Sequence, residues 1–139
     1  MKTLIYGAGP LGSLYAHRLH QADQDITILA RDERYKYIKK HGVVLIDEYT
    51  EKKEISKVRV VDTLAAEDAY DLIVVLIRKN KLLPIFQVLS QHKHLKNILF
   101  LGNNALGFDE YLEHLPKEYL TPNTPRLDLH CMRKPLWTK

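Results

Sequence analysis

Three glycines follow the first apolar run of the chain at a fixed spacing: Gly7, Gly9 and Gly12. Glycine weakens both strands and helices, so its repeated use here needs a physical reason. Residues 3–6 predict a short buried strand, and apolar residues then recur with helical spacing to about residue 21. The motif G-A-G-P-L-G therefore joins a strand to a helix, which requires a tight turn and a close contact between the two elements.

A glycine-rich turn between the first strand and first helix of a βαβ unit is the signature of a dinucleotide-binding loop. In such loops the N–H groups of the helix's first turn, together with the helix dipole, bind the diphosphate. Proline suits this turn because the first helical position can spare its N–H group. We therefore predict that a dinucleotide lies against the backbone of Gly7, Ala8, Gly9, Pro10, Leu11 and Gly12. The alternative interpretation is a glycine turn that holds no ligand.

Strands and helices alternate along the following hundred residues or so, which indicates βαβ units and a parallel sheet. Further buried strands are predicted at 26–29, 71–77 and 97–101, and helices at 33–40, 82–91 and 108–115. Asp32 is the predicted cap of the helix at 33–40. Residues 43–46 and 57–61 predict two strands that pair as a hairpin-like excursion. The expected fold is α/β, with a Rossmann-like, doubly wound and mostly parallel sheet in a single domain.

The chain of 139 residues divides into a predicted dinucleotide-binding domain at 1–118 and an atypical tail at 119–139. The tail shows no clear periodicity and is expected to be poorly ordered or loosely docked. No apolar run reaches the ~20 residues that cross a bilayer, and no signal peptide is recognisable, so we expect a cytoplasmic protein without membrane contact. Cys131 is the single cysteine, which excludes an internal disulfide framework.

Composition argues against two other classes of function. The net charge is +4, but the sequence has no Lys/Arg run with interleaved aromatic residues, so nucleic-acid binding is not expected. His92 and His94 alternate near a predicted helix end and lack the further ligands that a metal site needs, so no metal is expected.

Residues after three predicted strands indicate which dinucleotide binds and where. Arg31 stands where NAD enzymes usually carry an acid for the ribose 2′-hydroxyl, and a guanidinium suits the 2′-phosphate of NADP. Asp32 keeps NAD open as the alternative, because a shift of one residue would restore an acid. Arg78 and Asn103 follow the strands at 71–77 and 97–101, at the same predicted sheet edge. We expect both to contact the cofactor, and Asn103 to contact the substrate as well.

Four motifs together resemble the N-terminal domain of the ketopantoate reductases, also called 2-dehydropantoate 2-reductases. They are GAGPLGSLYAHRL at 7–19, LAR at 29–31, DLIVVLIRKNKL at 71–82 and ILFLGNNALG at 98–107. The resemblance implies that NADPH delivers a hydride to the ketone of 2-dehydropantoate, in pantothenate synthesis. It also implies that residues 7–12 and Arg31 hold the cofactor, and that Asn103 corresponds to an asparagine that touches both cofactor and substrate.

The sequence departs from the family pattern in several places. The family commonly has lysine at the position of Arg78 and glycine at the position of Asn104, so the substrate is expected to be ketopantoate or a related 2-keto acid. The family continues into a helical second domain that supplies the catalytic lysine, and the tail at 119–139 does not match it. A truncated gene or a shifted reading frame would produce such an end. No residue of the chain is assigned as catalytic.

Three hypotheses on function follow. In the first, the chain is a reductase fragment that binds NADP with little or no turnover, because hydride transfer also needs a proton donor. In the second, it is a stand-alone sensor domain that responds to NAD(P). In the third, it is a non-catalytic subunit that uses the fold for interaction. An apolar side left by the missing domain would leave homodimerisation open.

Overall fold

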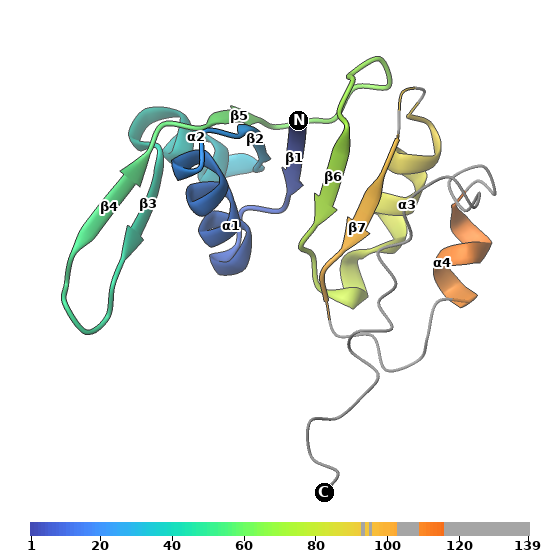
Figure 1. Cartoon of the computed structure of the whole chain (residues 1–139). Coiled ribbons are helices and arrows are strands. Elements are labelled where there is room, and N and C mark those ends of the chain that lie inside the picture. The colour runs from blue at the N-terminus through green and yellow to red at the C-terminus, as the bar shows by residue number, and fades with distance from the viewer. Residues whose placement is uncertain (93, 95, 103–108, 116–139) are drawn as a thin grey trace, which may run out of the picture.

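Five parallel strands form the main sheet of the computed structural model, which describes residues 1–92, 94, 96–102 and 109–115 (Figure 1). In spatial order they are β5 (Arg59–Val61), β2 (Asp25–Leu29), β1 (Lys2–Tyr6), β6 (Leu72–Val75) and β7 (Ile98–Phe100). The pairing register aligns Tyr6, Leu29 and Val75 at the carboxyl ends of the three central strands. The parallel α/β fold is confirmed, and its strand order reverses between β1 and β6, the point where such sheets bind ligands.

Helices cover both faces of this sheet. In the described part of the chain they are α1 (Pro10–Gln21), α2 (Asp32–His41), α3 (Leu83–Ser90) and α4 (Asp109–His114), with a 3₁₀ turn at Lys79–Lys81. On one face Leu4 of β1 packs in a cluster with Phe86 of α3. On the other face Ile5 packs in a second cluster with Ala16 of α1 and Ile38 of α2. Because both faces are covered, the central strands need apolar side chains at successive positions.

A separate two-stranded sheet lies beside α1 and projects away from the main sheet (Figure 1). It pairs β3 (Val43–Ile46) with β4 (Lys53–Ser56) in antiparallel register. The predicted pairing of 43–46 with 57–61 is therefore wrong, because β4 comes from the charged stretch and β5 pairs with β2 in the main sheet. The physical reason is that Glu54 and Ser56 turn inward to hydrogen-bond His17 of α1.

The start of α2 also differs from the prediction. Asp32 is not the cap of this helix, because Arg31 occupies the N-cap position and neither residue makes a side-chain capping bond. Asp32 is instead the first residue of the helix and has a φ of +51°. Residues other than glycine rarely adopt this conformation, so the backbone beside Arg31 is strained.

Candidate nucleotide-binding site

The glycine loop joins the carboxyl end of β1 to α1 and forms the centre of the site. Gly7 has a φ of +123°, and a methyl group there would lie 2.7 Å from the carbonyl oxygen of Leu76. A methyl group on Gly12 would overlap the carbonyl oxygen of Gly7, so α1 rests directly on the loop. Glycine is therefore required at both positions, by backbone conformation at Gly7 and by close approach at Gly12.

Gly9 differs from the other two glycines because its surroundings are open. It is the N-cap of α1, with extended backbone, and a methyl group there would meet no described atom within 4 Å. Pro10 lies in the first turn, and no side-chain bond caps this helix end in the described structure. Uncapped N–H groups at a helix N-terminus attract anions, and the open space at Gly9 lets one approach the backbone. The loop therefore fits a diphosphate.

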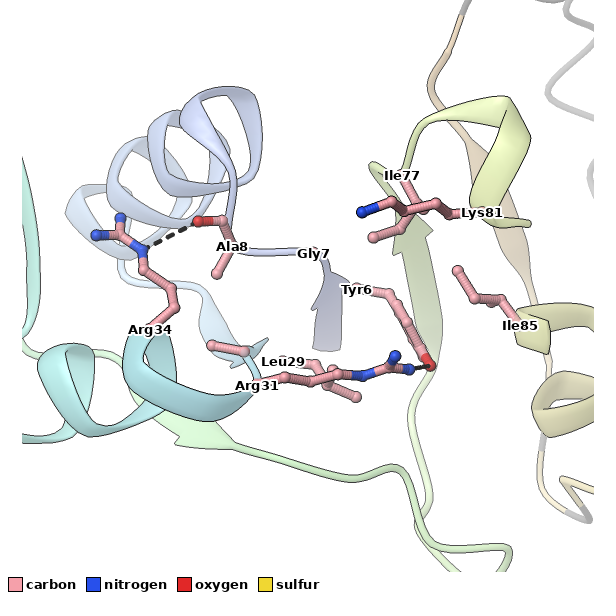
Figure 2. Close-up of a pocket in the computed structure, with 10 residues that line it drawn as sticks. Tyr6, Gly7, Ala8, Leu29, Arg31, Arg34, Ile77, Lys81 and Ile85 are labelled. Atoms are coloured by element: carbon pink, nitrogen blue, oxygen red, sulfur yellow. Dashed lines mark hydrogen bonds between the residues drawn. The ribbon is translucent and has the colours of Figure 1, made fainter. Parts of the chain in front are cut away.

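A hollow of about 310 Å³ opens beside this loop, between the carboxyl ends of β1, β2 and β6 (Figure 2). Gly7 and Ala8 line it together with three cationic side chains, those of Arg31, Arg34 and Lys81. Figure 2 shows the Lys81 side chain extending toward the glycine loop from the opposite wall. Three cations around one hollow favour an anionic ligand.

Arg31 spans the mouth of this hollow from the end of β2. Its Nη2 atom donates a hydrogen bond to the hydroxyl oxygen of Tyr6, at 3.0 Å (Figure 2). Since Tyr6 is the last residue of β1, this bond ties the guanidinium to the strand that leads into the glycine loop. Arg31, predicted from the end of the second strand, thus lines the same hollow as Gly7 and Ala8 of the predicted loop.

Sequence reasoning missed Arg34, which contacts the loop directly. Its Nε atom donates to the carbonyl oxygen of Ala8 at 3.1 Å, and its Nη2 atom donates to the hydroxyl of Ser13 at 2.9 Å. The available signal was spacing, because residues three apart on a helix share a face and Arg34 lies one turn after Arg31. Tyr6 and Lys81 were missed too, since an aromatic residue in a buried strand is typical of a core and a lysine after a strand is typical of a loop.

A second hollow, of about 660 Å³, continues from Arg31 toward the carboxyl end of β5. Tyr6 and Arg31 line this hollow as well as the first, so their hydrogen bond stands between the two. The remaining lining residues mix charged, aromatic and aliphatic side chains: Asp32, Tyr35, Lys36, Asp62, Thr63, Leu64 and Val88. Asp32 therefore shares this hollow with Arg31, and the acid that keeps NAD open lies beside the guanidinium that favours NADP.

A third hollow, of about 310 Å³, lies at the carboxyl ends of β6 and β7 and is mostly apolar. Leu11 of α1 and Arg78 line it, together with Tyr111 of α4. Leu11 and Arg78, both predicted to contact the cofactor, thus line this same hollow, one strand away from the hollow beside the glycine loop. Asn103, predicted to contact both cofactor and substrate, lies outside the described residues.

Two further sequence expectations concern metal and membrane. Within the described ranges, no three histidine, cysteine or acidic side chains gather in a way that could hold a metal ion. His92 is buried, and burial lowers its pKa, whereas His94 is exposed with its Nε2 atom 3.6 Å from Glu67. Among the described helices, none combines the length and apolar character that a membrane span requires.

The sheet order, the glycine turn after its first strand and the hollows along its carboxyl edge together define a Rossmann-type domain. The chain belongs to the ketopantoate reductase family PanE/ApbA, whose pattern matches residues 3–123. It corresponds to the N-terminal domain of that family. A search of curated protein sequences finds no significant match.

Solved structures agree with this assignment. The probable 2-dehydropantoate 2-reductase of Bacillus subtilis is 25% identical with a TM-score of 0.68, over 81% of this chain and 37% of its own. A D-mandelate dehydrogenase solved with NADH and anilino(oxo)acetate is 27% identical with a TM-score of 0.71, over 86% of this chain and 39% of its own. The 2-dehydropantoate 2-reductase of Geobacter metallireducens is 25% identical with a TM-score of 0.62, over 81% of this chain and 36% of its own. The chain thus spans less than two fifths of the length of these structures.

Proposed function

We propose that this chain binds NADP along the carboxyl edge of its sheet, as the cofactor-binding part of a ketopantoate reductase-like oxidoreductase. The observation that carries the proposal is the glycine loop with its open helix end, faced by Arg31 across a hollow of about 310 Å³. The loop and the helix terminus suit a diphosphate, and the guanidinium suits an additional phosphate. Family membership supports the same ligand class.

Each hollow would hold one part of the dinucleotide. The N–H groups at the start of α1 would bind the diphosphate, with Gly9 leaving room for its approach. Arg31 would bind the 2′-phosphate, and the hollow beyond it would take the adenine. The nicotinamide would lie toward the third hollow, which Leu11 and Arg78 line. We also propose that the cofactor-binding domain spans residues 1–118.

The residues around Arg31 bear on the choice between NADP and NAD, which differ at the ribose 2′ position. The D-mandelate dehydrogenase structure with NADH shows that a similar protein binds the nucleotide without the 2′-phosphate. In this chain Asp32 adjoins Arg31 and lines the same hollow, but Arg31 also reaches the hydroxyl of Tyr6 in the hollow next to the glycine loop. We favour NADP because the guanidinium stands between the two hollows, where the ribose would pass.

Bound NADPH would supply a hydride, and the substrate class that fits is a small 2-keto acid. The Arg78 guanidinium on the mostly apolar third hollow suits the carboxylate of such an acid. Reduction of the ketone also requires a proton for the developing alkoxide. Among the described residues that line this hollow, Tyr111 carries the one hydroxyl group, and there is no lysine, histidine or carboxyl side chain. The family resemblance assigns the catalytic lysine to a second domain, so we expect this chain by itself to bind cofactor with little or no turnover. We expect no nucleic-acid or membrane partner.

Titration of the chain with NADPH and with NADH, followed by nicotinamide fluorescence and by the melting temperature, tests the proposal. Ligand binding to the native state raises the melting temperature by mass action. We expect both nucleotides to bind and NADPH to bind more tightly. A preference for NADH would support the sensor hypothesis, and the absence of any shift with either nucleotide would support the interaction subunit.

A further inference from the structure

Arg34 links three elements that meet at the glycine loop. It lies in α2, and its guanidinium reaches the carbonyl oxygen of Ala8 in the loop (Figure 2). It also reaches the hydroxyl of Ser13 in α1. A guanidinium has several N–H donors in one rigid plane, so one side chain can hold two acceptors at a fixed separation. Arg34 therefore connects the turn between β1 and α1 to α2, beside the first hollow, which it also lines.

The bond to Ala8 fixes the direction of the next amide. The peptide group is planar and trans, so the carbonyl of Ala8 and the N–H of Gly9 point in opposite directions. Holding the oxygen toward Arg34 turns the Gly9 N–H away from Arg34. It also prevents a rotation of this peptide that would present a carbonyl oxygen, which repels anions, in place of an N–H donor.

The bond to Ser13 holds the other end of the same turn. Ser13 is almost fully buried, and its backbone N–H donates to the carbonyl oxygen of Gly9 at 2.9 Å. Its hydroxyl accepts from Arg34 Nη2, and also lies 3.5 Å from the carbonyl oxygen of Ala8. The carbonyl oxygens on both sides of the Gly9 N–H are thus held within one small network.

We infer that Arg34 is a positioning residue for the diphosphate loop and contributes equally to the binding of NADP and NAD. The inference rests on the proposed function and adds a division of labour within it. Arg31 acts at the ribose 2′ position, where the two nucleotides differ, whereas Arg34 acts on the loop that receives the diphosphate they share. Loss of the Arg34 contacts therefore weakens the binding of both nucleotides by the same factor.

Dissociation constants for NADPH and NADH, measured by fluorescence on the full chain and on Arg34→Gln, test this inference. We expect both constants to rise by the same factor, roughly three- to tenfold for two lost hydrogen bonds. Arg34→Lys keeps the charge but has one nitrogen for two acceptors, so its effect is intermediate and again equal. Arg18→Gln is the matched control, because Arg18 is an exposed arginine that contacts Gln21 on its own helix and Glu54 of the β3–β4 hairpin, and it lines none of the three hollows. Both constants stay unchanged there.

Two results would overturn the inference while leaving the proposed function intact. One is an Arg34→Gln chain that binds both nucleotides within twofold of the wild type. The other is a loss confined to NADPH, which would make Arg34 a ligand of the 2′-phosphate. If thermal unfolding shows that Arg34→Gln does not fold, Ser13→Ala removes one acceptor and takes its place, with a smaller equal loss expected and unchanged constants counting against the inference. A wild-type chain that binds neither nucleotide overturns the proposed function and the inference together.

Discussion

The glycine loop and the β3–β4 hairpin are both fixed against α1, but by different means. At the loop the fit is one of backbone against backbone, because α1 approaches so closely that Gly12 has no room for a side chain. At the hairpin the fit is polar. His17, whose exposed fraction is 1%, has Nε2 3.0 Å from Glu54 and Nδ1 2.9 Å from the Ser56 hydroxyl.

This difference shows which contacts can be recognised from the sequence alone. A backbone contact that excludes every side chain demands glycine, and three glycines at a fixed spacing are readable without a structure. A buried histidine with two polar partners asks only for common residue types. Those partners lie 37 and 39 residues away from His17 in the chain, so no local pattern connects them.

The largest expected effect separates two glycines of the same loop. Gly12→Ala places a methyl group on the Gly7 carbonyl oxygen, so we expect a loss of about 3 kcal/mol or more of folding free energy. Gly9→Ala adds the same methyl group in open space and should leave the free energy of unfolding unchanged. Urea unfolding measures both. Equal stability of the two variants would contradict the close packing of α1 on the loop.

Gly9→Ala should nevertheless weaken the binding of NADPH, because its methyl group occupies the path of the diphosphate to the backbone. We therefore expect this variant to fold like the wild type and to bind NADPH less tightly.

Removal of His17 is expected to have the next largest effect on stability. His17→Ala leaves the Ser56 hydroxyl without its partner, removes one partner of the Glu54 carboxylate, which keeps Lys52, and creates a cavity, which costs about 2–3 kcal/mol. The free energy of unfolding in urea gives the size of the loss. Binding of NADPH should stay within twofold of the wild type, because the hairpin lines none of the three hollows. A strong loss of NADPH binding in a folded His17→Ala chain would show that the two regions are coupled.

Arg31→Ala tests the site without disturbing the fold. We expect the dissociation constant of NADPH to rise roughly tenfold or more, the usual effect of losing one charged hydrogen bond, while that of NADH stays within about twofold. Lys40→Ala removes one positive charge at the exposed C-terminal end of α2, the helix whose N-cap is Arg31, and serves as the control. If Arg31→Ala weakened both nucleotides equally, Arg31 would not select the 2′-phosphate.

The smallest expected effect is a change in acid stability at the hairpin. Hydrogen bonds from Lys52 and His17 hold the pKa of Glu54 below its usual value of 4.5. The unfolded state therefore binds the proton more readily. The contribution of Glu54 to stability is present above pH 4.5 and is lost as the pH falls through the lowered pKa. Glu54→Gln should flatten the decline in unfolding free energy below pH 4.5, and an unchanged slope would show that other carboxyl groups cause it.

Much of the fold was predictable because its determinants are local and apolar. The run at 71–77 predicted a buried parallel strand, and β6 forms within it. The glycine spacing predicted the loop, and Gly7 and Gly12 meet the close contacts that it implies. The hairpin partner was mispredicted because Lys53–Ser56 is too polar to be recognised as a strand.

The site was only partly predictable, since several of its contacts join residues far apart in the chain. Arg34 lies 26 residues from Ala8, and Arg31 lies 25 residues from Tyr6. The roles of Arg78 and Asn103, the docking of the tail and the presence of a second copy stay predictions.

The central position of β1 in the sheet has a consequence for synthesis on the ribosome. β1 emerges before the other described strands, yet one of its two neighbours, β6, begins at residue 72. Until that segment leaves the exit tunnel, one edge of β1, the central strand, has no strand to pair with. Once β6 pairs with β1, Asp71 accepts a hydrogen bond from the backbone N–H of Lys2 at 2.9 Å. We expect the emerging chain to depend on protection from premature association until the residues of β6 have left the ribosome.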